Sequence, residues 1–182
     1  MTQISFQTQL HRPGGKDKGA DWTFLNLPTE ASEKLPSRSM VSVEGTFNGE
    51  NFQATLEPDG QGGHWLKVSE KLRLKVKAEA GEMVDLSIAP TTEEPEPEVP
   101  EDFQAALDAA SDLARETWSA ITPLARRDWI FWIVSGKKAE TRIKRTEVAI
   151  SKLSAGSRRP CCFDRSGMYS KSLTCPISDD ES

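Results

Sequence analysis

The side chains of this chain best suited to chemistry are cations and tryptophans gathered in its second half. Lys138, Arg142 and Arg145 have the spacing that places side chains on one face of a helix. Guanidinium and ammonium groups bind phosphates and carboxylates, and an indole ring stacks on a guanidinium. The pattern therefore predicts a site for an anionic ligand. The six residues assigned to it are Arg126, Arg127, Trp132, Lys138, Arg142 and Arg145.

The same residues also fit a purely structural role. Charged faces of helices are commonly solvated, and ion pairs such as Arg142 with Asp128 contribute little when they are exposed. Trp129 and Trp132 are large enough to fill the core of a small helical module. Both interpretations stay open on the sequence alone.

Few other residues suggest chemistry. Cys161, Cys162 and Cys175 are an odd number of cysteines near the end of the chain, and we expect free thiols whose role stays open. His64 follows two glycines and supports a rival hypothesis, an uncharacterised enzyme whose cavity lies in the first half. Because the common catalytic and cofactor-binding motifs are missing from the sequence, we favour a non-enzymatic protein with no metal and no cofactor.

Charge leaves nucleic-acid binding as a third hypothesis. Residues 104–160 carry 11 basic and 6 acidic side chains, a net charge of +5 that favours a phosphate backbone. The whole chain has a formal net charge of −5, however, and Glu140 and Glu147 belong to the same predicted helix as the cations. An anionic small molecule or an acidic peptide is the partner that we favour. The ligand and the oligomeric state are not identified by the sequence.

The first half alternates apolar and polar residues in short runs, which predicts β-strands. Asn48-Gly49 between two runs predicts a type I′ hairpin, and 69–82 reads as one short helix capped by Ser69. Six strands with one helix predict a closed barrel, because closure removes exposed strand edges. The predicted strands are 4–10, 22–27, 40–47, 51–58, 64–68 and 83–88.

The second half has a helical period. Helices are predicted over 101–118, 123–135 and 138–154, with Leu113 on the buried face of the first. The fold class is therefore α+β, a closed six-stranded barrel followed by a three-helix module. The predicted boundaries are a barrel domain at 1–90, an acidic Pro-rich linker at 91–100, the helical module at 101–160 and a flexible tail at 161–182.

Location follows from two absences in the sequence. Its apolar runs are shorter than the ~20 residues that span a bilayer. The first residues also lack the basic start and apolar block of a secretory signal. We expect a cytoplasmic protein.

Two sets of motifs resemble known families. The helical half resembles the YdeI/OmpD-associated, or bacteriocin-protection, family, and the first half resembles the small barrel domain of unknown function that often precedes it. The resemblance implies a role in tolerance of antimicrobial peptides or envelope stress, and it implies no known reaction. The helical motifs are Pro100-Glu101-Asp102-Phe103, Ala106-Leu107, Trp118, Arg126-Arg127, Trp132-Ile133, Lys137-Lys138, Glu140-Thr141-Arg142 and Arg145. The barrel motifs are Trp22, Leu27-Pro28, Val43-Glu44-Gly45-Thr46, Asn48-Gly49, Phe52, Leu56, Gly63-His64 and Gly81-Glu82-Met83-Val84, where Glu82 replaces the usual aspartate.

Overall fold

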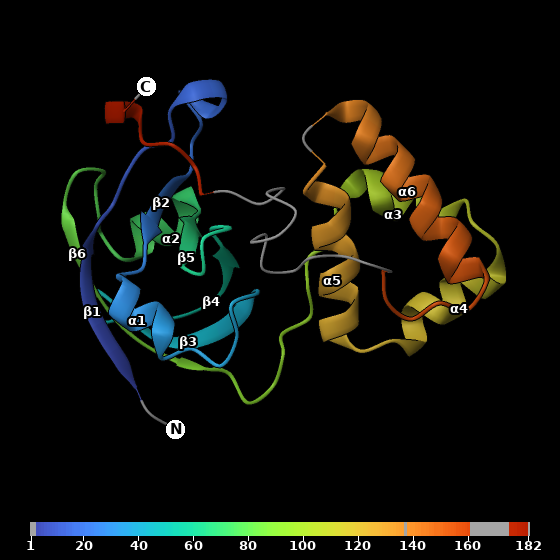
Figure 1. The fold of residues 1–182 in the computed structure, drawn as a ribbon, viewed down its shortest axis with the longest axis horizontal. Helices are drawn as coiled ribbons and strands as arrows, with labels where there is room; N and C mark the ends of the chain where they lie inside the picture. Colours follow the sequence, from blue (N-terminus) through green and yellow to red (C-terminus); the bar gives the residue numbers. More distant parts are fainter. Residues whose placement is uncertain (1–2, 137, 161–174, 182) are drawn as a thin grey trace. The chain divides into compact units, whose positions relative to one another are not determined.

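The structure is a computed structural model that describes residues 3–136, 138–160 and 175–181. The chain divides into two compact units, coloured along the sequence in Figure 1. The barrel unit contains the described residues up to Thr92 together with 175–181. The helical unit contains those from Glu93 to 160. Each unit is described by itself.

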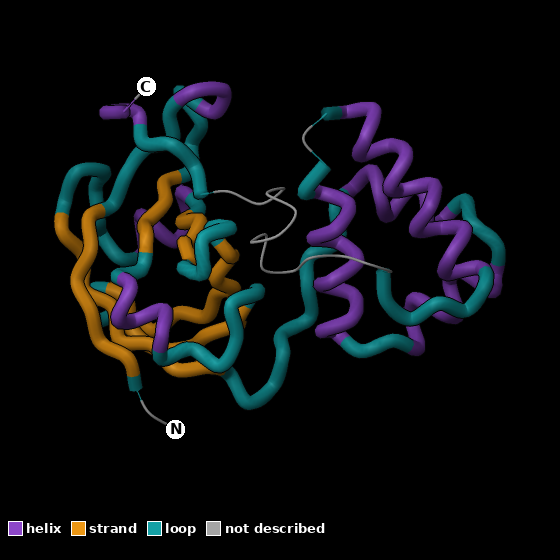
Figure 2. The backbone as a smooth tube through the Cα atoms, in the orientation of Figure 1, coloured by secondary structure: helices purple, strands orange, loops and turns teal. Residues whose placement is uncertain are grey.

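The barrel unit is built on one antiparallel sheet of six strands, drawn in orange in Figure 2. The strands are β1 (Ile4–Gln9), β2 (Thr23–Asn26), β3 (Val41–Phe47), β4 (Glu50–Pro58), β5 (His64–Val68) and β6 (Met83–Pro90). Their order in the sheet is β1-β6-β3-β4-β5-β2. His11, just after β1, exchanges backbone hydrogen bonds of 2.8 and 2.9 Å with Phe24 of β2. This pair connects the two outer strands and closes the barrel.

The interior of the barrel explains why the strands alternate. Inward-facing side chains such as Val43, Leu56 and Ile88 are at most 1% exposed. Gly45 of β3 allows close packing, since a Cβ there would lie 1.9 Å from the carbonyl oxygen of Ser87 on β6. Asn48 and Gly49 have φ values of 49° and 84°, the positive angles that the predicted type I′ turn requires.

Among the described residues of the barrel unit, two short α-helices and two 3-10 helices, Gly15–Asp17 and Asp179–Glu181, accompany the strands, where the sequence predicts one helix. The predicted helix forms as α2 (Glu70–Lys75), and the Ser69 side chain caps it by accepting a hydrogen bond from the Leu72 amide. It ends well before Gly81 because Lys77 takes a left-handed conformation with φ of 54°. The additional α-helix is α1 (Thr29–Glu33), which follows Pro28 and places Ala31 in the barrel core.

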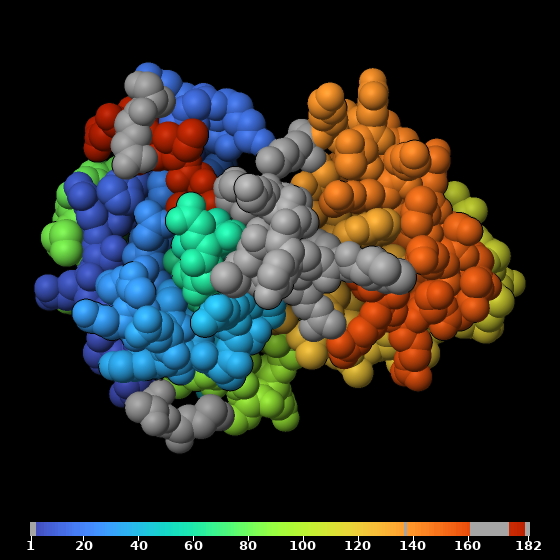
Figure 3. Space-filling view, in the orientation of Figure 1, coloured from blue at the N-terminus to red at the C-terminus, as the bar shows by residue number. Residues whose placement is uncertain are grey.

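Residues 175–181 differ from the flexible tail that we predicted. The Gly14 amide donates to the Ile177 carbonyl at 2.7 Å, and the Asp179 amide donates to the Arg12 carbonyl at 3.0 Å. In the space-filling view this red segment lies against the blue residues that follow β1 (Figure 3). Backbone pairing therefore holds this segment on the barrel. Cys161 and Cys162 lie outside the described residues.

The helical unit contains α3 (Glu101–Asp108), α4 (Asp112–Ala120), α5 (Pro123–Val134) and α6 (Ala139–Ser154). The fold class is confirmed, but the predicted first helix is divided into α3 and α4. Ser111 interrupts it, because its hydroxyl accepts a hydrogen bond from the Ala114 amide and so begins a new helix. The break turns Leu113 outward, where it is 52% exposed. Within the described parts of the chain, every helix is too short or too polar to cross a membrane.

The core of the helical unit lies between its helices. Phe103 of α3, Trp129 of α5 and Leu153 of α6 are completely buried. The Trp129 indole N–H donates to the Arg158 carbonyl at 3.1 Å, which satisfies the polar atom of this buried ring. The prediction that Trp129 fills the core is confirmed.

Candidate functional site

Arg126 lies in the first turn of α5 and is held by the unit's own groups. Its guanidinium forms two hydrogen bonds of 2.7 Å with the carboxylate of Glu96. It also donates to the carbonyls of Trp118 and Ile121, at 3.1 and 2.6 Å, where α4 ends. Because the last carbonyls of a helix lack intrahelical donors, Arg126 acts as a side-chain cap of α4.

Arg127 has a similar partner from the same acidic segment. One guanidinium nitrogen lies 2.5 Å from a carboxylate oxygen of Glu94, and the Arg127 side chain is only 10% exposed. We had predicted that residues 91–100 form an extended spacer. They contain no helix or strand after Pro90, yet Glu94 and Glu96 bind arginines of α5. The two carboxylates occupy positions that an external anion would take.

Trp132 and Arg145 form a stacked pair at the other end of α5. The Arg145 guanidinium carbon lies 5.5 Å from the centre of the Trp132 ring. Its Nη1 donates to the Trp132 carbonyl at 2.6 Å and to the Ser135 hydroxyl at 2.8 Å. The Trp132 ring also meets the Trp129 ring edge-on at 5.9 Å. Arg145 therefore ties α6 to the end of α5 and keeps the Trp132 ring in one orientation.

Arg142 and Lys138 lie on the α6 side of this pair. Arg142 makes a two-point contact with Asp102 of α3, at 2.8 and 3.0 Å. The guanidinium of Arg142 is the main cause that lowers the pKa of Asp102 below its usual value. Lys138 is exposed at the N-cap position of α6. The sequence predicts that these cations share one face of the helix, but Lys138 has an extended backbone at the N-cap position, and only Arg142 and Arg145 lie within α6. The suggested ion pair of Arg142 with Asp128 is replaced by one with Asp102.

The six predicted residues do not meet at one point. Arg126 contacts carbonyls that precede α5, whereas Arg145 contacts the Trp132 carbonyl and the Ser135 hydroxyl at its end. A 12-residue helix separates these two places, which corresponds to about 18 Å at a rise of about 1.5 Å per residue. The predicted residues that belong to the end of α5 or to the N-cap and first two turns of α6 are called the α5–α6 cluster below. Its members are Trp132, Lys138, Arg142 and Arg145.

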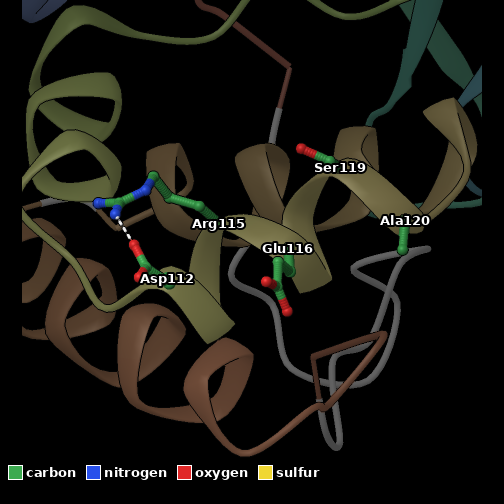
Figure 4. A pocket seen from close by; sticks show the side chains of 5 residues that line it. All are labelled: Asp112, Arg115, Glu116, Ser119 and Ala120. Atoms are coloured by element: carbon green, nitrogen blue, oxygen red, sulfur yellow. Dashed lines mark hydrogen bonds and ion pairs between the residues drawn. The ribbon is translucent and has the colours of Figure 1, made fainter.

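The exposed face of α4 carries a shallow hollow of about 500 Å³ that the sequence did not point to (Figure 4). It is lined by Asp112, Arg115, Glu116, Ser119 and Ala120. Arg115 forms an ion pair with Asp112 and donates to the Ala110 carbonyl at 2.6 Å. The sequence signal that could have pointed to this hollow is the i, i+3 spacing of Asp112 and Arg115, which by itself indicates an ion pair within one helix. None of the six predicted residues lines this hollow.

His64, on which the enzyme hypothesis depended, lies inside the barrel unit with 1% exposure. Its Nε2 atom lies 2.9 Å from the Ser39 carbonyl oxygen, so the proton is on Nε2. Burial lowers the pKa of His64, which favours the neutral ring. Nδ1 is buried without a hydrogen-bond partner. The geometry thus provides a fixed neutral imidazole.

Thiol and metal chemistry concern Cys175 and the possible metal ligands of the described residues. The Cys175 thiol donates to the Asn26 side-chain oxygen at 2.7 Å. Across the described residues, we find no group of three or more His, Cys, Asp or Glu side chains arranged to hold a metal ion. The thiol has a structural contact in the barrel unit.

Comparison with known proteins identifies both halves. Residues 6–88 match the model of a domain of unknown function, DUF1905. Residues 96–156 match the model described as bacteriocin-protection, YdeI or OmpD-associated. No curated protein matches the chain significantly. The chain is thus similar to a DUF1905 domain followed by a bacteriocin-protection, YdeI or OmpD-associated domain, the tandem arrangement that its motifs predicted.

Proposed function

We propose that this protein acts in stress tolerance as a non-enzymatic binding protein, and that its helical unit binds an anionic ligand at the α5–α6 cluster. The family match supports a stress-related or envelope-related role. The observation that supports the binding proposal is the Trp132–Arg145 stack, and Lys138, exposed at the N-cap position of α6, is proposed to complete the site. An acidic peptide is the ligand class that we favour.

Preorganisation is the physical reason for this choice. Arg145 and Trp132 are already fixed by hydrogen bonds and by the Trp129 contact, so binding does not have to order them. Lys138 adds a mobile ammonium group in water, which attracts an anion and can release it again. Arg142 can contribute only by sharing its guanidinium between the ligand and Asp102.

Arg126 and Arg127 are excluded from the proposed contact surface. Both hold glutamates of the acidic segment, and their side chains are only 14% and 10% exposed. Each of these arginines already has a carboxylate partner from its own unit, so an external anion can only exchange one partner for another and gains little free energy.

The test uses the full chain and a fluorescein-labelled hexaglutamate peptide, with binding followed by fluorescence anisotropy at low salt. We expect Lys138→Ala to weaken binding about threefold to fivefold, because an exposed charge pair contributes up to about 1 kcal/mol. Lys144→Ala is the matched control, since Lys144 is also exposed on α6 but lies on a different face. It should change the affinity less than twofold. Neither variant should change the melting temperature.

Three results would contradict the proposal. The first is an absence of saturable binding of the peptide to the wild-type chain. The second is an equal loss of affinity in Lys138→Ala and Lys144→Ala, which indicates general charge attraction. The third is preference for a single-stranded oligonucleotide over hexaglutamate, with steep weakening by salt, which would favour the nucleic-acid hypothesis.

A further inference from the structure

The barrel unit contains a second hollow, of about 560 Å³, between α1 with the loop that follows it and the loop from β4 to β5. This volume lies within the range of about 300–1,000 Å³ that is typical of small-molecule sites. Its walls come from one unit only. The lining residues used below are Leu27, Ser32, Glu33, Leu35, Arg38 and Asp59.

One buried hydroxyl in this hollow is unexplained by the fold. Ser32 is 6% exposed, lines the hollow, and its Oγ has no hydrogen-bond partner. A buried polar atom without a partner costs about 1–3 kcal/mol, and such an atom at a cavity wall indicates that something else is meant to bind it. The nearby backbone of α1 leaves this hydroxyl free to act as donor or acceptor.

The remaining walls define what the hollow can accept. Leu27 and Leu35 are buried and supply apolar surface. Arg38 is an exposed cation of the lining, whereas Glu33 and Asp59 are carboxylates. Asp59 is already fixed, because one of its oxygens accepts from the amides of Gln61 and Gly63, at 2.7 and 2.9 Å. A ligand that matches these walls carries a carboxylate, an ammonium group and a small apolar part.

We infer that this hollow binds a small zwitterion of the amino-acid or dipeptide class, which hydrogen-bonds to the Ser32 hydroxyl. The carboxylate faces Arg38, and the ammonium group faces Glu33 and Asp59. The side chain rests on Leu27 and Leu35. This site is independent of the α5–α6 cluster, because all of its residues belong to the barrel unit.

The test is a titration of the ¹⁵N-labelled full chain with L-alanyl-L-alanine, followed by NMR. We expect saturable shifts of the Ser32, Gly62 and Gly63 amides, with a dissociation constant of about 1 mM or lower for a ligand of this size. N-acetyl-L-alanyl-L-alanine amide, which lacks both charges, should give no saturable shift. Saturation by the capped peptide, or none by the free dipeptide, would overturn the inference.

Two variants locate the contacts. Ser32→Ala should weaken dipeptide binding about fivefold, as expected for one lost hydrogen bond, without lowering the melting temperature. Ser5→Ala is the matched control on an exposed part of β1 and should bind as the wild type does. Arg38→Gln should weaken binding of L-alanyl-L-alanine but not of its C-terminal amide. Unchanged affinity in Ser32→Ala, or equal losses for both ligands in Arg38→Gln, would contradict the assignment.

Discussion

Replacing Arg126 by alanine tests whether this residue of the predicted site is structural. The guanidinium donates to two carbonyls at the end of α4 and to both oxygens of Glu96. Hydrogen bonds from a charged donor contribute about 1.5–3 kcal/mol each, and a surface ion pair contributes about 0–1 kcal/mol. Both carbonyl contacts come from the same nitrogen, Nη1, so their contributions do not simply add. We therefore expect Arg126→Ala to lower the free energy of unfolding by about 3 kcal/mol.

Two companion variants separate the contributions. Glu96→Gln removes the ion pair but keeps the carbonyl contacts, and the Glu96 side chain is 58% exposed, so its cost should stay below about 1 kcal/mol. Arg126→Lys keeps the charge but cannot reach both carbonyls and the carboxylate with one ammonium group. Its cost should be intermediate, about 2 kcal/mol.

The assay is urea unfolding of the full chain, followed through the NMR signal of the Trp129 indole proton. This proton is suitable because Trp129 is completely buried in the helical unit and its indole is hydrogen-bonded there. If Arg126→Ala unfolds within about 0.5 kcal/mol of the wild type, the guanidinium is not structural, and the reasoning that removes it from the ligand site fails. Equal costs for Arg126→Ala and Glu96→Gln would refute the capping role.

Two further predictions concern the barrel unit. Burial raises the pKa of Glu57 from 4.5 to about 7. Between these two pH values the folded state keeps a proton that the unfolded state has released. The free energy of unfolding therefore falls as the pH rises through this window. Glu57→Gln should therefore stabilise the chain by about 2–3 kcal/mol at pH 8 and by little at pH 4, measured by urea unfolding at both values; equal effects at both would contradict the assignment. Gly45→Ala should destabilise the barrel by about 3 kcal/mol or prevent its folding, because the new Cβ collides with the Ser87 carbonyl, and wild-type thermal stability in this variant would contradict that packing.

The strands could be predicted from sequence because each carries its own local signal. Alternation marks the two faces of β1, β4 and β6, and Asn48-Gly49 encodes its turn through the positive φ angles that these two residues tolerate. The caps at Ser69 and Thr122 are local in the same sense, since each hydroxyl accepts from an amide three residues later. Five-residue α1 has too few residues to show a helical period.

The division of the first predicted helix into α3 and α4 shows how one residue, Ser111, changes which side chains are buried. Apolar residues at Phe103, Leu107 and Leu113 fit one continuous helical face, and propensity alone does not separate them. Ser111 competes by bonding to the Ala114 amide, which starts a second helix with a different phase. Leu113 is then exposed although its spacing predicts burial.

The candidate site could be predicted only as far as local spacing reaches. A period of 3.6 residues relates Arg142 to Arg145 within α6, whereas Lys138 lies just before the helix, at its N-cap. The acidic partners of the arginines do not follow from this period, because Asp102 lies 40 residues before Arg142 in the chain and Glu96 lies 30 residues before Arg126. Such pairs depend on tertiary packing, which spacing does not encode.

These distant pairs change what the charge of the helical half means. A net charge of +5 over residues 104–160 suggests a strongly attractive surface, but Arg126, Arg127 and Arg142 each face a carboxylate from residues 94–102. Their fields are largely cancelled at the distance of a ligand. What remains for recognition is a small number of contacts around the fixed Trp132 ring. A ligand held this way is selected more by the shape that fits against the ring than by its total charge, so affinity should depend only weakly on salt.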